Sequence, residues 1–285
     1  MKSNYRYIVK AFMAMAVIAG TTSCDDFLDR EPMSSISPET YYSTAAQLEA
    51  NLNDEYPNVL PSFGQWTYGI FGEDKGTDNQ IEVNANDRYT QDRWKVPHSE
   101  SDNWKFERIY RINFFLSEAL PKFGEDMSGS QNTISGSVAT IKHYIGEMYF
   151  LRAYEYFKKL QLFGDFPIIN QPLADEMEAL REASKRFPRN EVARFIISDL
   201  DKAYAYMSDV DMATTRINKD VAMLVKSRVA LFEATWLQNF KGTAFVPGGE
   251  GWPGASLHNN YQYPSGNIDN EVKYFLEQAV EASKL

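Results

Sequence analysis

The sequence is poor in cysteine, and this scarcity excludes an internal disulfide. The chain of 285 residues contains one cysteine, Cys24, so its stability has to come from a packed core. Positive charge is also scarce, because 29 Lys and Arg stand against 39 Asp and Glu and give a net charge of -10. Binding to nucleic acid requires Lys and Arg to neutralise phosphates. The sequence therefore predicts no nucleic-acid partner.

Long apolar runs are absent as well. The apolar run at residues 11–20 is about half of the ~20 residues that a membrane-spanning helix needs. Three basic residues and no acid precede this run, and small residues follow it. A basic start, a short apolar middle and small residues at a cleavage point are typical of a secretory signal. We therefore predict a lipoprotein signal peptide at residues 1–23.

Cys24 directly follows the small residues of that segment. Its position predicts lipidation of the thiol after cleavage, so that the chain meets the membrane through a lipid anchor only. The alternative is an ordinary signal peptide beside a chance thiol, because Thr21 stands where a lipobox has leucine. With the anchor in place, residues 24–36 form a lipidated polar tether and residues 37–285 form the folded domain.

Apolar residues recur at helical spacing through most of this domain. A first helix is expected to begin at Ser37 and Pro38 and to end at Pro57 and Pro61. A second is expected from Trp104 until Pro121 stops it. Further helices are predicted at 141–163, 191–207, 220–239 and 270–285, with a partly helical link at 165–188 and irregular loops at 62–102, 124–136 and 241–268.

Three of these helices share a pattern in which leucine is followed by alanine three residues later. The pairs are Leu116 with Ala119, Leu200 with Ala203, and Leu276 with Ala279. Small residues in the following helices, such as Gly146 and Ala222, allow close helix approach. The pattern favours a mainly α fold of tetratricopeptide-like helical pairs, with loop insertions that spoil the ~34-residue period. The alternative is an ordinary bundle of unrelated amphipathic helices. Because the third pair lacks its second helix, we expect the sequence to be the N-terminal portion of a longer fold.

Three segments resemble the SusD/RagB family of outer-membrane nutrient-binding lipoproteins. The start at residues 24–32 is similar to the mature N-terminus of that family, and residues 104–113 (WKFERIYRIN) are similar to its first repeat helix. The strongest resemblance is at residues 146–169 (GEMYFLRAYEYFKKLQLFGDFPII), which match the family's Arg-Ala-Tyr-x-Tyr-Phe and Leu-Phe-Gly-Asp-x-Pro pattern. Members of the family are about twice as long as this chain.

This resemblance implies a lipid-anchored protein of the outer membrane, on the cell surface, that lids a SusC-like TonB-dependent transporter. Its partners would be that transporter and an oligosaccharide, or in some members a peptide. It implies capture without catalysis, and no cofactor. The alternative is a helical scaffold that docks on the transporter and binds a peptide or no ligand of its own.

Candidate ligand contacts lie in the aromatic loop at 62–102. An indole face beside Asp, Asn or Arg side chains matches both the apolar face and the polar rim of a sugar. Trp66 and Trp94 are such residues, and by position the resemblance implies Asp78, Trp94 and His98 as ligand contacts. The alternative is that Trp66 and Trp94 pin the loop to the helical core.

Other chemistries are poorly supported by the sequence. Residues 249–254 spell G-x-G-x-x-G, but no predicted strand precedes them and Pro253 interrupts the turn, so we expect a glycine-rich loop that presents Trp252. The three histidines, His98, His143 and His258, lack metal-ligand spacing. The loop carboxylates Glu73, Asp74 and Asp78 are weak candidates for a glycosidase pair or a calcium site. The sequence therefore predicts a binding protein with no catalytic residue, metal or cofactor.

Overall fold

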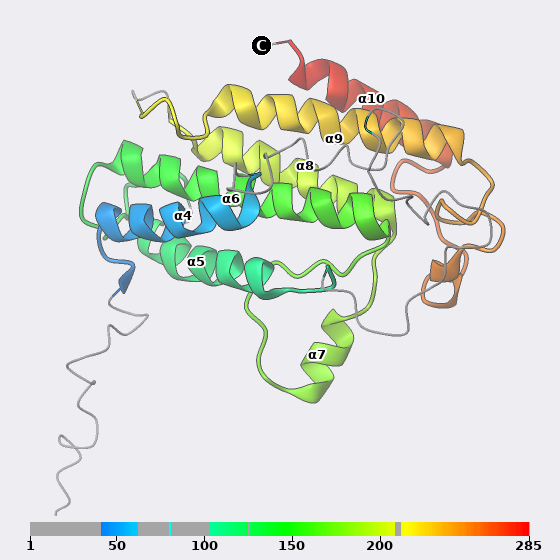
Figure 1. Cartoon of the computed structure of the whole chain (residues 1–285), viewed down its shortest axis with the longest axis horizontal. Helices are drawn as coiled ribbons and strands as arrows, with labels where there is room; N and C mark the ends of the chain where they lie inside the picture. Colours follow the sequence, from blue (N-terminus) through cyan, green and yellow to red (C-terminus); the bar gives the residue numbers. More distant parts are fainter. Residues whose placement is uncertain (1–40, 62–79, 81–102, 125, 209–211, 285) are drawn as a thin grey trace, which may run out of the picture. The chain divides into compact units, whose positions relative to one another are not determined.

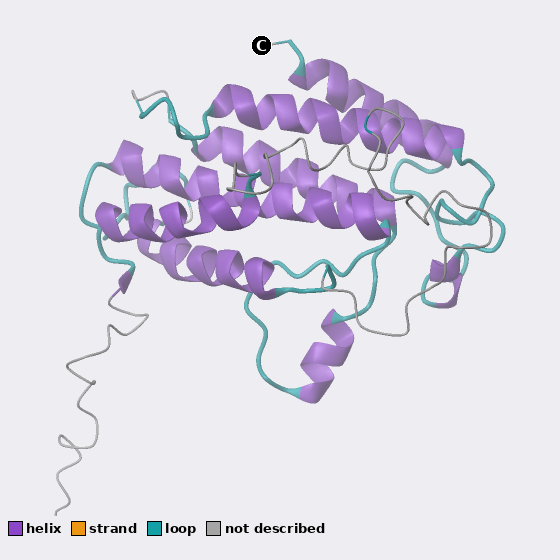
Figure 2. Cartoon of the chain, viewed as in Figure 1, coloured by secondary structure: helices purple, strands orange, loops and turns teal. Residues whose placement is uncertain are grey.

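The computed structural model describes residues 41–61, 80, 103–124, 126–208 and 212–284. The chain divides into two compact units, Met1–Tyr41 and Tyr42–Leu285, and the helices described below belong to the second. Within the described residues the secondary structure is helical and contains only isolated β-bridges in place of strands, as Figure 2 shows. The elements are α4 (Ala45–Val59), α5 (Glu107–Phe123), α6 (Val138–Phe163), α7 (Met177–Ala183), α8 (Arg189–Tyr206), α9 (Lys219–Asn239), the short 3-10 helix η3 (Pro253–Ser256) and α10 (Ile268–Ala282).

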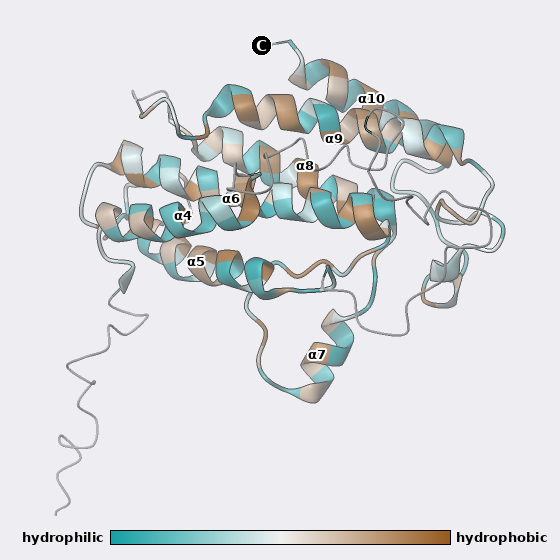
Figure 3. Ribbon diagram, viewed as in Figure 1, coloured by the Kyte–Doolittle hydropathy of each residue, from teal (hydrophilic) through white to brown (hydrophobic). Residues whose placement is uncertain are grey.

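Successive helices pack side by side (Figure 1). Helix α6 contacts α4, α5 and α8, helix α8 also contacts α9, and α9 contacts α10. The helices carry both hydrophilic and hydrophobic residues along their length (Figure 3). Many of the hydrophobic side chains of α4, α5, α6, α8, α9 and α10 are buried and form the core. The prediction of a mainly α fold built from tetratricopeptide-like pairs is confirmed.

Helix α6 is the most enclosed element because three helices surround it. Its start is capped by Ser137, whose hydroxyl accepts a hydrogen bond from the Thr140 amide, and Gly164 ends it with a φ of 69° that favours glycine. At Gly146 a side chain would place its Cβ 2.8 Å from the Met207 amide nitrogen and 2.9 Å from the Ala203 carbonyl oxygen. The predicted role of Gly146 in close helix approach is confirmed.

Two of the three prolines expected to stop helices lie inside them, whereas the third, Pro61, follows the end of α4 as predicted. Helix α4 continues past Pro57 to Val59, and α5 continues past Pro121 to Phe123. A proline inside a helix costs about 3 kcal/mol. Val59 and Phe123 are fully buried, and burying such side chains contributes about 1.5–3 kcal/mol each. Tertiary packing of the last residue therefore offsets the local penalty.

Of two further predicted helix starts, one is untested and the other is wrong. Helix α4 begins at Ala45, where Thr44 and Gln47 form a capping box that the sequence analysis overlooked, and the start expected at residues 37 and 38 lies outside the described residues. Helix α5 begins at Glu107 rather than at Trp104. Trp104 instead packs edge-on against Phe163 and Phe166 at the end of α6, a contact that removes apolar surface from water.

The leucine-alanine repeat is buried in two of its three copies. Leu116, Ala119, Leu200 and Ala203 belong to the core. Leu276 on α10 is 38% exposed, because α9 is the only described helix that packs extensively against α10.

The Arg-Ala-Tyr-x-Tyr-Phe motif has a structural explanation. Arg152 on α6 donates two hydrogen bonds, of 2.6 and 2.8 Å, to the carboxylate of Asp199 on α8. Its third nitrogen donates to the Asn113 side chain of α5 and to the Asn170 carbonyl. Tyr156 of the same motif exchanges hydrogen bonds with the backbone of Ile169. The motif thus joins three helices and fixes the segment that follows α6.

Candidate functional site

The sequence-predicted site residues cannot be placed next to the helices. Asp78, Trp94, His98 and Trp66 all lie outside the described residues, and so does Cys24. These assignments stay predictions.

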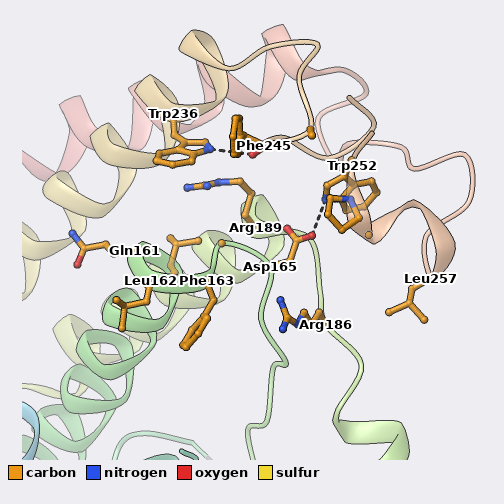
Figure 4. A pocket seen from close by; sticks show the side chains of 15 residues that line it. Gln161, Leu162, Phe163, Asp165, Arg186, Arg189, Trp236, Phe245, Trp252 and Leu257 are labelled. Carbon is orange, nitrogen blue, oxygen red and sulfur yellow. Dashed lines mark hydrogen bonds between the residues drawn. The ribbon is translucent and has the colours of Figure 1, made fainter. Parts of the chain in front are cut away.

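The described residues form a different candidate site where α6 ends, α8 begins and the loop after α9 folds back (Figure 4). A cavity of about 540 Å³ lies there, within the ~300–1,000 Å³ typical of small-molecule sites. Residues from four chain segments line it: Leu160, Gln161, Leu162, Phe163, Gly164, Asp165, Arg186, Arg189, Trp236, Ala244, Phe245, Trp252, Pro253, Gly254 and Leu257.

The floor of the cavity is set by the end of α6. Gly164 turns the chain, and Phe166 then exchanges backbone hydrogen bonds of 3.1 and 3.0 Å with Phe187. This bridge places the turn at Gly164 beside Arg186 and Arg189, although more than twenty residues separate them in the sequence. A Cβ at position 164 would lie 3.5 Å from Nη1 of Arg189, so the glycine leaves that nitrogen uncovered.

Arg189 is the first residue of α8 and is held by Glu233 of α9. Its Nε and Nη2 atoms donate to the Glu233 carboxylate at distances of 2.9 to 3.1 Å. Complete burial raises the pKa of Glu233 above its ordinary value, although the charge of Arg189 opposes this. The guanidinium also lies 4.0 Å from the ring centroid of Trp236, so the arginine orients the indole that forms one wall.

Two aromatic rings offer apolar faces to the cavity. Trp236, on α9, donates its indole N–H to the Phe245 carbonyl at 3.0 Å, which holds the loop near the helix. The Phe245 side chain is 62% exposed and packs edge-on against Phe240. An exposed aromatic ring fixed beside an indole provides a flat surface for an apolar ligand face.

Trp252 forms the opposite wall and is not presented to solvent as the sequence suggested. Its side chain is 5% exposed, and its indole N–H donates to Oδ2 of Asp165 at 2.7 Å. The Arg189 amide donates to Oδ1 of the same carboxylate at 2.9 Å. Burial raises the pKa of Asp165 above its ordinary value, against these two hydrogen bonds. A Cβ at Gly254 would clash with the Trp252 ring, which explains one glycine of the 249–254 loop.

Arg186 stands at the rim of the cavity, on the segment that leads into α8. Its guanidinium lies 4.6 Å from the ring centroid of Trp104, and its backbone carbonyl is within 2.8 Å of the His258 Nε2 atom. Every other arginine that the structure describes forms an ion pair, except Arg228 on the outer face of α9. Arg186 has none with the described carboxylates.

This arrangement is suited to binding. It combines aromatic faces, guanidinium donors and the amide of Gln161 around an open space.

The described residues contain no group of three or more His, Cys, Asp or Glu side chains that could hold a metal ion. His143 is buried, with Nε2 at 3.0 Å from the Ile217 carbonyl and Nδ1 accepting from the Ser208 amide, so its role is structural. No helix in the described ranges has both the length and the apolar character required to cross a membrane.

Sequence reasoning missed the cavity residues apart from Trp252. The available signal was the run Arg186-Phe-Pro-Arg189 before α8, with two cations and a proline at the helix start. A second signal was the recurrence of aromatic residues every four to five positions, at Trp236, Phe240 and Phe245.

A family model and the curated relatives that match this chain all carry the SusD-like name. A SusD-like family model, described as starch-binding and associating with the outer membrane, matches residues 26–231. SusD-like protein P2 of Formosa agariphila is 25% identical over 253 residues, which cover 85% of this chain and 46% of that protein. SusD-like protein P25 of the same organism is 25% identical over 233 residues, which cover 75% of this chain and 41% of that protein.

Solved structures give the same family name. A SusD-like carbohydrate-binding protein from Bacteroides fragilis is 18% identical with a TM-score of 0.46, over 70% of this chain and 40% of that chain. The chain spans less than half the length of the curated relatives named above. Because the family model covers well over half of the chain, the protein belongs to the SusD-like family, whose model is described as starch-binding and associating with the outer membrane.

Proposed function

We propose that this protein captures oligosaccharides at the cell surface and delivers them to a SusC-like TonB-dependent transporter of the outer membrane. The observation that carries the proposal is the cavity beside α6, α8 and α9, in a chain whose family is described as starch-binding. Capture is an equilibrium process in this proposal, and the protein performs no chemistry on its ligand.

The shape and chemistry of the cavity support a sugar ligand. Pyranose rings have an apolar C–H face, for which Trp236 and Phe245 supply flat surfaces. Their hydroxyl rims require hydrogen-bonding partners, and Gln161 and Arg186 lie at the edge of the same cavity. A few polar groups around apolar walls are the usual composition of a small-molecule site.

The loop at 62–102 supplies further ligand contacts in this proposal. Asp78, Trp94, His98 and Trp66 are the residues that we assign to it, on the basis of their chemistry and position in the sequence.

Attachment to the membrane is assigned to Cys24. We propose that residues 1–23 are removed, that the Cys24 thiol is lipidated and that residues 24–36 act as the tether of the folded domain. The protein would then remain near its transporter while it binds and releases ligand. Replacement by Cys24→Ser should release it from the outer-membrane fraction without changing its ligand affinity. Retention in that fraction without the transporter would contradict the anchor.

Isothermal titration calorimetry against a panel of oligosaccharides tests the proposed function. We expect at least one saturable ligand and no product on prolonged incubation. We also expect Trp236→Ala to lower the affinity at least tenfold, because truncating a tryptophan that is a binding hot spot costs about 2 kcal/mol or more. Leu224→Ala is the matched control, because this residue is exposed on the same helix and does not line the cavity. Trp94→Ala tests the loop separately.

Three results would contradict the proposal. Hydrolysis of an oligosaccharide would make the protein an enzyme. An unchanged affinity in Trp236→Ala would remove the cavity from the site. The absence of any binding would favour the alternative of a scaffold that only docks on the transporter.

A further inference from the structure

We propose that the cavity beside α6, α8 and α9 selects an acidic sugar residue, one that bears a carboxylate or a sulfate group, and that Arg186 recognises the anion. This inference rests on the proposed function, because it specifies which oligosaccharides the cavity takes. It assigns the apolar sugar face to Trp236 and Phe245 and the charged substituent to the arginine side of the cavity.

The first argument is that Arg186 forms no ion pair with the described carboxylates, although its charge acts at longer range to lower the pKa of Asp165. Its guanidinium has no ion pair with any carboxylate of the described residues, whereas Arg111, Arg152 and Arg216 are each held by acids. Stacking on Trp104 occupies one face of the guanidinium and leaves its N–H edge available. Such an edge matches a carboxylate or sulfate with two parallel hydrogen bonds.

The second argument is the position of this edge. The backbone of Arg186 is tied at its carbonyl to His258, and Phe187 next to it is bridged to Phe166. The arginine is therefore attached to a fixed segment at the cavity rim, and Figure 4 places it below Asp165 in that view. Little backbone order has to be gained on binding, which favours affinity.

The third argument is the excess of donors over acceptors in the cavity. Nη1 of Arg189 has no hydrogen bond within the described part of the chain and faces the space that Gly164 leaves open. The one carboxylate among the lining residues, Asp165, already accepts from Trp252 and from the Arg189 amide. A ligand group rich in acceptors satisfies these donors, whereas a neutral hydroxyl satisfies them only in part.

Binding measurements on the 285-residue chain in detergent test the inference. The probes are oligogalacturonate, oligoalginate and sulfated galactan oligosaccharides, each compared with its own neutral form after carboxyl reduction or desulfation. We expect at least one acidic probe to bind and its neutral form to bind at least tenfold more weakly. Whether carboxylated or sulfated probes bind identifies the source of the anion.

Variants at two arginines then locate the selectivity. Arg186→Gln should abolish the preference for the acidic form while binding of the neutral form persists, and Arg186→Lys should retain part of the preference. Arg228→Gln is the matched control, because Arg228 also lacks an ion pair with the described carboxylates but does not line the cavity.

Four outcomes decide the inference. The acidic preference and its loss in Arg186→Gln support it. Equal binding of acidic and neutral forms overturns it and leaves the proposed function standing. An acidic preference that survives Arg186→Gln also overturns the assignment to this residue. Failure of every oligosaccharide, acidic and neutral, overturns both the inference and the proposed function.

Discussion

Arg152 and Arg189 are both buried and both hold a carboxylate across two helices, yet their surroundings differ. Around Arg152, Asp199 and the side chain and backbone oxygens of two asparagines use all three guanidinium nitrogens. Around Arg189, Glu233 takes two nitrogens and the third faces the cavity. The structural arginine uses all three of its guanidinium nitrogens, whereas Arg189 keeps one nitrogen uncommitted at the cavity.

The difference follows from where each residue lies along its helix. Arg152 is in the middle of α6, where α5 and α8 enclose it and the neighbouring chain at Asn170 closes the remaining space. Arg189 is the first residue of α8, at the level where α6 has ended at Gly164. Helix ends leave volume that only loops can fill, and the loop after α9 fills it in part.

The largest effect is expected at the satisfied arginine. Arg152→Met removes the bidentate partner of Asp199 and leaves a buried carboxylate with only the half-exposed Lys202, 3.7 Å away, as a described cation beside it, which should lower the free energy of unfolding by about 3–5 kcal/mol. Urea denaturation followed by circular dichroism measures this loss. The double variant Arg152→Met with Asp199→Leu should recover much of it. A loss below about 1 kcal/mol in the single variant would show that the pair is not structural.

A smaller loss is expected from the close approach of α6 and α8. Gly146→Ala places a methyl group against the Met207 amide and the Ala203 carbonyl, and such overpacking costs about 1–3 kcal/mol. Gln161→Ala is the control, because it is exposed on the same helix and should change stability by less than about 0.5 kcal/mol. If Gly146→Ala were stabilising, as helix propensity alone predicts, the two helices would be less tightly packed than we describe.

The wall of the cavity should show an intermediate effect that depends on pH. Trp252→Phe leaves Oδ2 of Asp165 without its donor, which costs about 1–3 kcal/mol when the carboxylate is ionised. Burial already raises the Asp165 pKa above 3.8, so the folded state holds this proton more tightly and stability falls as the pH rises from 3.8 through the raised pKa. The lost hydrogen bond raises the pKa further.

The cost of Trp252→Phe should therefore grow as the pH rises through the raised pKa of Asp165 and become small below it, where Asp165 is protonated in the folded state of both proteins. Unfolding curves of the variant and the wild type, recorded from about pH 3 to about pH 8, measure this difference. Asp165→Asn as a background should remove the pH dependence of the cost. A cost that is constant across this range would mean that packing, and not the hydrogen bond, fixes Trp252.

The smallest effect on stability is expected at the unpaired arginine. Arg186→Gln loses only the contact with the Trp104 ring, which is worth about 0.5–1 kcal/mol at an exposed site. Thermal unfolding should therefore shift little, while the preference for acidic ligands disappears. A loss as large as that of Arg152→Met would place Arg186 among the structural arginines and end the contrast between the two regions.

Much of the helical fold could be predicted from local signals. The period of apolar residues and the stop at Gly164 located α6, and the same reasoning located α8, α9 and α10 to within a few residues. The errors at Pro57 and Pro121 arose because burial of a residue two positions later outweighed a local penalty. The sequence-predicted ligand residues at 62–102 lie outside the described residues and stay predictions.

The sequence by itself determined the helices and the Arg-Ala-Tyr-x-Tyr-Phe motif, because periodicity and capping act within a few residues. Only the tertiary structure decided which arginines are satisfied and which are available, since Asp199 and Glu233 are each more than forty positions from their partners. It also decided the cavity, by bringing Gly164, Arg186 and Trp236 together at three helix ends. Side-chain pairing across helices depends on packing geometry, which a local pattern does not contain.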